Sequence, residues 1–114
     1  MTLQDLLEPA AQTAGVLGTL IVSRDDGLVV AGQLQRPVKG PAVAALAAAL
    51  AAKAAAVAEA LGEPEPSILE LAGSEGALFA APARSGLLLV TVAARGADTA
   101  EIRRELLRLA DRVG

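Results

Sequence analysis

Carboxylates are the main residues of this chain able to carry out acid–base or metal chemistry, and the spacing of the closest pair points to a structural use. Asp25 and Asp26 stand side by side immediately before Gly27. Two carboxylates can bind a divalent cation, but a calcium loop needs further oxygen ligands at regular spacing, and none follows here. Adjacent acids before a glycine are typical of a hairpin tip, where the glycine adopts a positive φ. We therefore expect no metal site.

Nucleophilic catalysis lacks its usual partners in this sequence. The chain contains no histidine and no cysteine, which removes the commonest general base and all thiolate chemistry. Its serines have no histidine to activate them, and nothing in the sequence brings Lys39 or Lys53 near one. The two common phosphate-binding patterns, GxxxxGK followed by Ser or Thr and GxGxxG, are absent. We expect neither a catalytic residue nor a cofactor.

Arginines gather near the C-terminus, and two interpretations are open. They are Arg103, Arg104, Arg108 and Arg112. One interpretation is a basic patch for anionic lipid or an acidic partner. The other is a solvated helix face, which we favour because acids lie three residues from these arginines and arginine late in a helix suits its dipole. The expected pairs are Glu101–Arg104, Glu105–Arg108 and Arg108–Asp111.

The composition predicts a single domain over residues 1–114 with an aliphatic core. Hydrophobic residues make up 54% of the 114 residues but aromatic residues only 1%, so Leu, Val, Ile and Ala must fill the core. A net charge of −3 gives no general attraction to nucleic acid. Met1–Pro9 carries Asp5 and Glu8 without a basic start, unlike a signal peptide. We expect a soluble, cytoplasmic protein.

The most unusual segment is Pro41–Leu61, which consists almost entirely of alanine and leucine. Alanine is the best helix former, Pro41 suits the first helical position and Gly62 suits the stop. Its length is about that of a membrane span, but Lys53 in the middle would cost about 2.5–3.5 kcal/mol in a bilayer, so we expect no membrane insertion.

Larger apolar residues of this helix share one stripe at about 100° per residue. They are Val43, Leu46, Leu50, Val57 and Leu61. We expect this stripe to pack against a sheet. The methyl-lined remainder then becomes a surface that another helix or protein can approach closely. The alternative is that biased codon usage enriches alanine wherever it is tolerated.

The other segments predict an α+β fold. A first helix is expected over Thr2–Ala14, bent or interrupted near Glu8 because of Pro9. A last helix is capped by Asp98 and Glu101 and buries Ile102, Leu106, Leu109 and Val113. Strands are predicted at Thr19–Ser23, Leu28–Gly32, Ser67–Ala72, Ala77–Ala81 and Leu87–Ala93. The apolar run at the start of the last strand suits a central strand covered on both faces. The result is a five-stranded antiparallel sheet with helices on both faces.

The first hairpin and the order of elements resemble the Roadblock/dynein light chain family, and within it the small bacterial MglB-like regulators. The resemblance rests on GVLGTLIV at 15–22 leading into DGLVVA at 26–31, followed by the alanine-rich helix. It continues with GAL at 76–78, GLLLV at 86–90 and IRREL at 102–106, and so covers nearly the whole chain. The first hairpin is its most specific part.

The resemblance implies a profilin-like αββαβββα sandwich whose sheet continues across a homodimer. In that family the central helix pairs with its twin, and the strand near Ser67–Ala72 pairs edge to edge with its copy. Family members bind Ras-like small GTPases as activators or scaffolds, or act as adaptors. They need no nucleotide pocket of their own, and we assign no arginine finger to Arg24, Arg84 or Arg95.

The interface implied for this chain combines alanines of the long helix with residues of the third strand. Its residues are Ala44, Ala48, Ala51, Ala55, Ala58, Ser67, Leu69 and Leu71. We therefore expect a homodimeric module that regulates a small GTPase. The alternative is a structural adaptor of a larger signalling or motility complex, with no effect on GTP turnover. A small-ligand sensor is disfavoured because the core offers few polar or aromatic residues to line a pocket.

Overall fold

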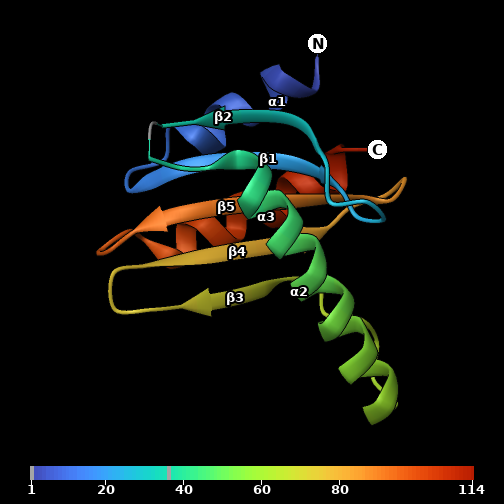
Figure 1. Cartoon of the computed structure of the whole chain (residues 1–114). Helices are drawn as coiled ribbons and strands as arrows, with labels where there is room; N and C mark the ends of the chain where they lie inside the picture. The colour runs from blue at the N-terminus through green and yellow to red at the C-terminus, as the bar shows by residue number, and fades with distance from the viewer. Residues whose placement is uncertain (1, 36) are drawn as a thin grey trace.

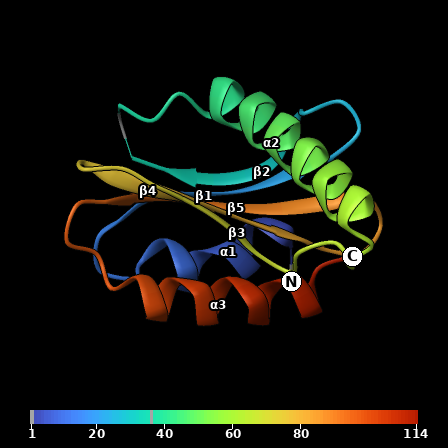
Figure 2. The same ribbon diagram turned by 90° about the horizontal axis from the view of Figure 1, so that it is seen from below.

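The chain folds as three layers, with one antiparallel sheet between two layers of helix (Figures 1 and 2). The computed structural model describes residues 2–35 and 37–114. Within those residues the helices are α1 (Leu3–Ala11), α2 (Gly40–Leu61) and α3 (Thr99–Arg112). The strands are β1 (Val16–Ser23), β2 (Val29–Leu34), β3 (Leu69–Ala72), β4 (Gly76–Pro82) and β5 (Leu87–Ala94). The predicted fold class and element order are confirmed.

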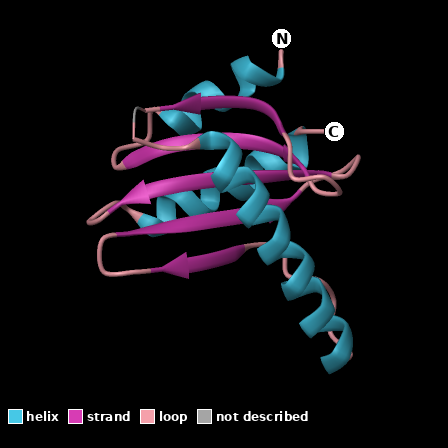
Figure 3. Ribbon diagram, in the orientation of Figure 1, coloured by secondary structure: helices cyan, strands magenta, loops and turns pink. Residues whose placement is uncertain are grey.

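The strands lie in the order β2-β1-β5-β4-β3, and every neighbouring pair is antiparallel. The predicted strands differ from the observed ones only at their ends. β1 begins at Val16 because it pairs with Ala93 of β5 from that residue on. β5 is the central strand, and the burial of Leu88, Leu89 and Val90 confirms that both of its faces are covered. β2 and β3 form the two edges (Figure 3).

The sheet separates two cores of different character. On the side of α1 and α3 the core is built from large side chains, among them Leu7, Phe79 and Leu106. On the side of α2 the sheet supplies the large residues and the helix supplies alanines. Figure 2 shows α2 alone on one face, with α1 and α3 together on the other.

Helix α1 runs without interruption from Leu3 to Ala11, so of the two expected outcomes near Glu8 the interruption is wrong, while a bend stays a prediction. Thr2 and Asp5 form a complete capping box at its start, as the sequence indicates. Pro9 lies in the last turn of the helix, which ends at Ala11. Because the helix stops two residues later, the proline removes a backbone hydrogen bond without disrupting any longer run.

Helix α2 has the predicted length but is rotated about its own axis relative to the predicted orientation. The alanines Ala44, Ala47, Ala48 and Ala51 pack on the sheet. Of the predicted buried stripe, Leu46, Val57 and Leu61 are 69%, 59% and 71% exposed. Leu50 is half-buried, and Val43 packs against the core as predicted. The physical reason is volume: the sheet face already carries large side chains, so the small face of the helix fits against it. Gly62, with φ +72°, ends the helix as expected.

The length and composition of α2 also suffice for a membrane span. In the folded chain, however, the first half of α2 packs on the sheet and forms one side of the core beneath it.

Helix α3 agrees with the sequence-based prediction in its cap and in its buried residues. Asp98 accepts a hydrogen bond from the Glu101 backbone N–H at 3.1 Å, and Ile102, Leu106 and Val113 are buried.

Candidate protein-interaction surface

The surface of α2 divides into three sectors about 120° apart, given about 100° per residue. The first sector holds the alanines packed on the sheet. The second faces the β1–β2 hairpin, where Ala45, Ala49 and Ala52 border a groove beside Asp25 and Asp26. The third lies on the other flank of the helix and carries its large apolar residues. We call this third sector the leucine row, comprising Leu46, Leu50, Val57 and Leu61.

The second half of α2 projects past the edge of the sheet. Figure 1 shows the helix crossing the strands diagonally and continuing beyond β3, before the chain returns to that strand. Ala58 is the one buried residue of α2 beyond Ala51. The returning segment is held by an ion pair between Glu65 and Arg24 of the hairpin. The projecting half therefore presents Val57 and Leu61 of the leucine row away from the chain's own sheet.

The diagonal path of α2 leaves part of the sheet uncovered on the same face. An open hollow of about 560 Å³ lies there, around the β3–β4 turn and the neighbouring strands. Its large apolar side chains are Leu17, Leu71, Leu78 and Val92. Leu71 and Leu78 are paired across β3 and β4, and Leu78 also packs against the core beneath α2. The hollow is thus a continuation of the apolar sheet face that α2 leaves open.

The outer edge of β3 is the second open feature of this face. β3 pairs with β4 from Leu69 to Ala72, and the described residues place no strand on its other side. Ser67 is exposed just before the strand, Leu69 is half-buried, and Leu71 is 61% exposed. An unpaired edge of this kind offers backbone donors and acceptors to another strand.

The structure divides the residues expected at the interface into two groups. Ala44, Ala48, Ala51 and Ala58 are buried within the chain, so this face of α2 is not available to a partner, and the orientation assumed for it is wrong. Ala55 is half-buried, and Ser67, Leu69 and Leu71 lie along the open edge. Their part in an interface stays a prediction.

Sequence reasoning missed the large apolar residues that the fold leaves uncovered. On α2 and around the hollow they include the exposed Leu46, Val57 and Leu61 and the half-buried Leu78 and Val92. The periodicity identified the stripe on α2 correctly but not its direction. The residues that indicate which side of α2 is buried lie in the strands. The sheet face beneath the helix is already filled by large side chains, namely Leu20, Val22, Leu88 and Val90.

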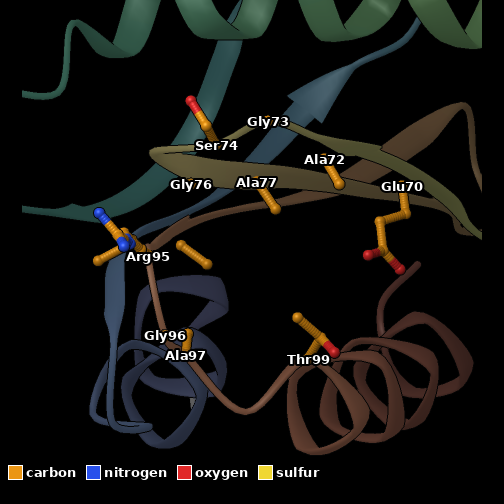
Figure 4. Close-up of a pocket in the computed structure, with 12 residues that line it drawn as sticks. Glu70, Ala72, Gly73, Ser74, Gly76, Ala77, Arg95, Gly96, Ala97 and Thr99 are labelled. Carbon is orange, nitrogen blue, oxygen red and sulfur yellow. The ribbon is translucent and has the colours of Figure 1, made fainter.

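A smaller hollow lies between the β3–β4 turn and the start of α3, and Figure 4 shows its lining. Most of that lining is glycine and alanine, with Glu70, Arg95 and Thr99 as the larger polar residues. Glu70 accepts a hydrogen bond from Arg103 of α3 at 2.7 Å, which ties the two sides together. The described residues contain no group of acids able to hold a metal ion.

The arginines of α3 form ion pairs on the opposite face of the molecule. Arg104 pairs with Glu101 and Arg108 pairs with Glu105, as the spacing predicts. Among the described residues Arg108 makes no ion pair with Asp111, so the third expected pair is wrong. Arg103 instead reaches Glu70 of β3. The Arg104–Glu101 pair is exposed on both sides, and such a pair stabilises by at most about 1 kcal/mol. These contacts fit the interpretation of a solvated helix face.

This architecture and its uncovered face define a Roadblock-type module, and the chain belongs to the Roadblock/LC7 domain family, whose model matches residues 2–93. Among solved structures it is similar to a Roadblock/LC7 domain from Streptomyces avermitilis, with 24% identity and a TM-score of 0.86 over 96% of this chain and 92% of that one. No curated protein sequence matches it.

Two further similar structures are MglB proteins. The gliding protein MglB from Thermus thermophilus has 25% identity and a TM-score of 0.84, covering 94% of this chain and 82% of that one. An MglB described as having a tetrameric arrangement has 26% identity and a TM-score of 0.86, covering 95% and 82%.

Proposed function

We propose that residues 1–114 form one Roadblock-type module that acts in the cytoplasm as a homodimer and regulates a Ras-like small GTPase. The observation that supports this best is that the leucine row, the hollow and the open edge of β3 all lie on one face. Membership of the Roadblock/LC7 family and likeness to MglB support the regulatory role. The module has no catalytic group of its own in this proposal.

The homodimer is built around a two-fold axis beside β3. Two β3 strands pair antiparallel, and the two sheets become one. The symmetry about this axis places the projecting half of each α2 over the sheet of the other copy. Val57 and Leu61 of one copy then cover the hollow around Leu71 and Leu78 of the other. Burying a Leu or Val side chain contributes about 1.5–3 kcal/mol, so covering this surface favours association by several kcal/mol.

The GTPase in this proposal contacts the part of α2 that the homodimer leaves free. The sector with Ala45, Ala49 and Ala52 points toward the hairpin and away from the leucine row. Its small side chains allow another backbone to approach closely. Asp25 and Asp26 at the rim add negative charge, which favours a partner surface with basic residues.

Substitution on the leucine row tests the homodimer. Val57→Glu places a charge on a side chain that is 59% exposed in the single chain, so the fold should survive. We expect size-exclusion chromatography with light scattering to give two chains for the wild type and one for Val57→Glu. The matched control is Ala56→Glu, which adds the same charge to an exposed neighbour outside the row. A monomeric wild type would refute the homodimer.

The regulatory role is tested with a Ras-like GTPase from the same genome. We expect the wild type to change its rate of GTP hydrolysis, and Val57→Glu to lose this effect along with dimerisation. Binding with an unchanged rate would favour the structural adaptor instead. Absence of both binding and rate change with every such GTPase would rule out the regulatory role.

A further inference from the structure

The sheet has two edges, and only one of them is open. Two open edges on one chain would let copies add at both sides, giving an open-ended assembly instead of a closed pair. In the described part of the chain no strand pairs with the outer edge of β3. At β2 the situation differs, because a side chain from α1 reaches that edge.

The side chain is that of Gln4, and its carboxamide binds both backbone groups of Gly32. The Gly32 N–H donates to Gln4 Oε1 at 3.2 Å, and Gln4 Nε2 donates to the Gly32 carbonyl oxygen. A carboxamide presents an acceptor oxygen beside a donor NH2 group, as the N–H and C=O of one residue in an antiparallel neighbouring strand do. Gln4 therefore occupies the same hydrogen-bonding groups that an added strand would use.

The register of β2 shows why Gly32 is the central point of this edge. Gly32 lies opposite Leu20 of β1, and the Gln35 N–H, three residues along, donates to the Leu17 carbonyl oxygen of β1. In an antiparallel pair alternate residues point their backbone groups to opposite sides, so Gly32 points away from β1. It lies in the middle of the six residues Val29–Leu34. A block at this position interrupts any new ladder at its centre.

Gln4 is held firmly enough to act in this way. It lies in the first turn of α1, where Asp5 N–H donates to Thr2 Oγ1 at 3.1 Å and Thr2 N–H to Asp5 Oδ2 at 3.0 Å. Leu7 in the next turn is fully buried and anchors the helix under the sheet. The side chain is thus presented to the edge by a capped and anchored helix.

We infer that Gln4 closes the β2 edge, so that copies of this chain associate through β3 alone and stop at two. The part of this inference that says assembly stops at two copies rests on the proposed homodimer. Its core claim, that Gln4 prevents strand addition at β2, stands on the hydrogen bonds to Gly32.

The test compares Gln4→Ala with Gln12→Ala and Leu6→Ala in the full chain. Gln12 lies at the other end of α1, and its side chain contacts Glu8 and not the sheet edge. Leu6→Ala weakens the packing of α1 while leaving Gln4 in place. Hydrogen exchange at the Gly32 amide and light scattering over a range of concentrations are measured for each variant.

At the lowest concentration, where Gln4→Ala is not assembled through β2, we expect the Gly32 amide to exchange about fivefold faster than in the wild type, the factor that corresponds to one lost hydrogen bond. We also expect only Gln4→Ala to form species larger than the wild type, growing with concentration. Unchanged mass for Gln4→Ala would overturn the inference, as would the same growth in Leu6→Ala. If the wild type is a monomer, the homodimer fails, but larger species in Gln4→Ala alone still support the closed edge.

Discussion

At the scale of single residues, small side chains set how closely the hairpin and α2 approach each other. Gly27 at the hairpin tip has φ +69°, and a Cβ atom added there would lie 3.1 Å from the Ala45 Cα. A glycine is therefore required at this position for two reasons: the backbone has a positive φ, and the helix approaches too closely for a side chain. Gly86 in the β4–β5 turn has a similar φ of +71° with nothing within 4 Å.

Substituting Gly27 and Gly86 separately distinguishes backbone strain at positive φ from steric crowding against α2. Gly86→Ala should lose about 1 kcal/mol of unfolding free energy, because an L-residue is strained at positive φ. Gly27→Ala should lose at least about 1 kcal/mol more, because the helix must also shift. Urea unfolding measures both. Equal losses would show that the hairpin does not restrain α2.

At the scale of elements, α2 is amphipathic in volume rather than in polarity. Its buried sector and its exposed flanks are both apolar, and what distinguishes them is side-chain size. Pairing across β1 and β5 brings Leu20 beside Val90 and Val22 beside Leu88. These four side chains leave room for methyl groups above them, and the larger residues of α2 turn to the flank.

A larger side chain placed between α2 and the sheet should therefore lower the free energy of unfolding. Ala44 is fully buried, and Ala44→Leu should lose about 1–3 kcal/mol of unfolding free energy because the added atoms push α2 away from the sheet. Ala42 is exposed on the same turn, and Ala42→Leu should stay within about 0.5 kcal/mol of the wild type. A tolerated Ala44→Leu would mean that the contact between α2 and the sheet is loose.

At the scale of the whole molecule, the two faces of the sandwich differ in how completely they are covered. α1 and α3 together cover one face, and their ion pairs and buried stripes complete it. α2 alone covers only part of the other face (Figure 2). The leucine row, the hollow and the open edge of β3 are consequences of this one asymmetry.

The proposed homodimer should couple stability to concentration. Since only folded chains dimerise, the midpoint of thermal unfolding should rise with protein concentration for the wild type. For Val57→Glu the midpoint should be independent of concentration and lie near the dilute wild-type value. Calorimetry over a wide concentration range measures this. A concentration-independent wild-type midpoint would argue against an interface of several kcal/mol.

Much of the fold follows from local sequence signals. The capping residues Thr2 and Asp98, the turn at Gly27 and the stop at Gly62 act through nearby backbone atoms. Helix α3 could be predicted in detail, including Ile102 and its other buried residues, because large apolar and charged residues alternate there with a clear helical period. Part of the candidate surface, Leu69 and Leu71 on β3, follows from the order of the strands and the family resemblance.

Two features required the tertiary structure. The direction of α2 depends on the volumes of Leu20 and Val90, which lie on different strands and meet only in the folded sheet. An alanine helix has no polarity contrast to indicate its buried side, so periodicity alone cannot orient it. The closure of β2 likewise depends on Gln4 meeting Gly32, 28 residues away. The sequence thus determined the elements and their order, while side-chain volume and long-range pairing decided which surfaces remain open.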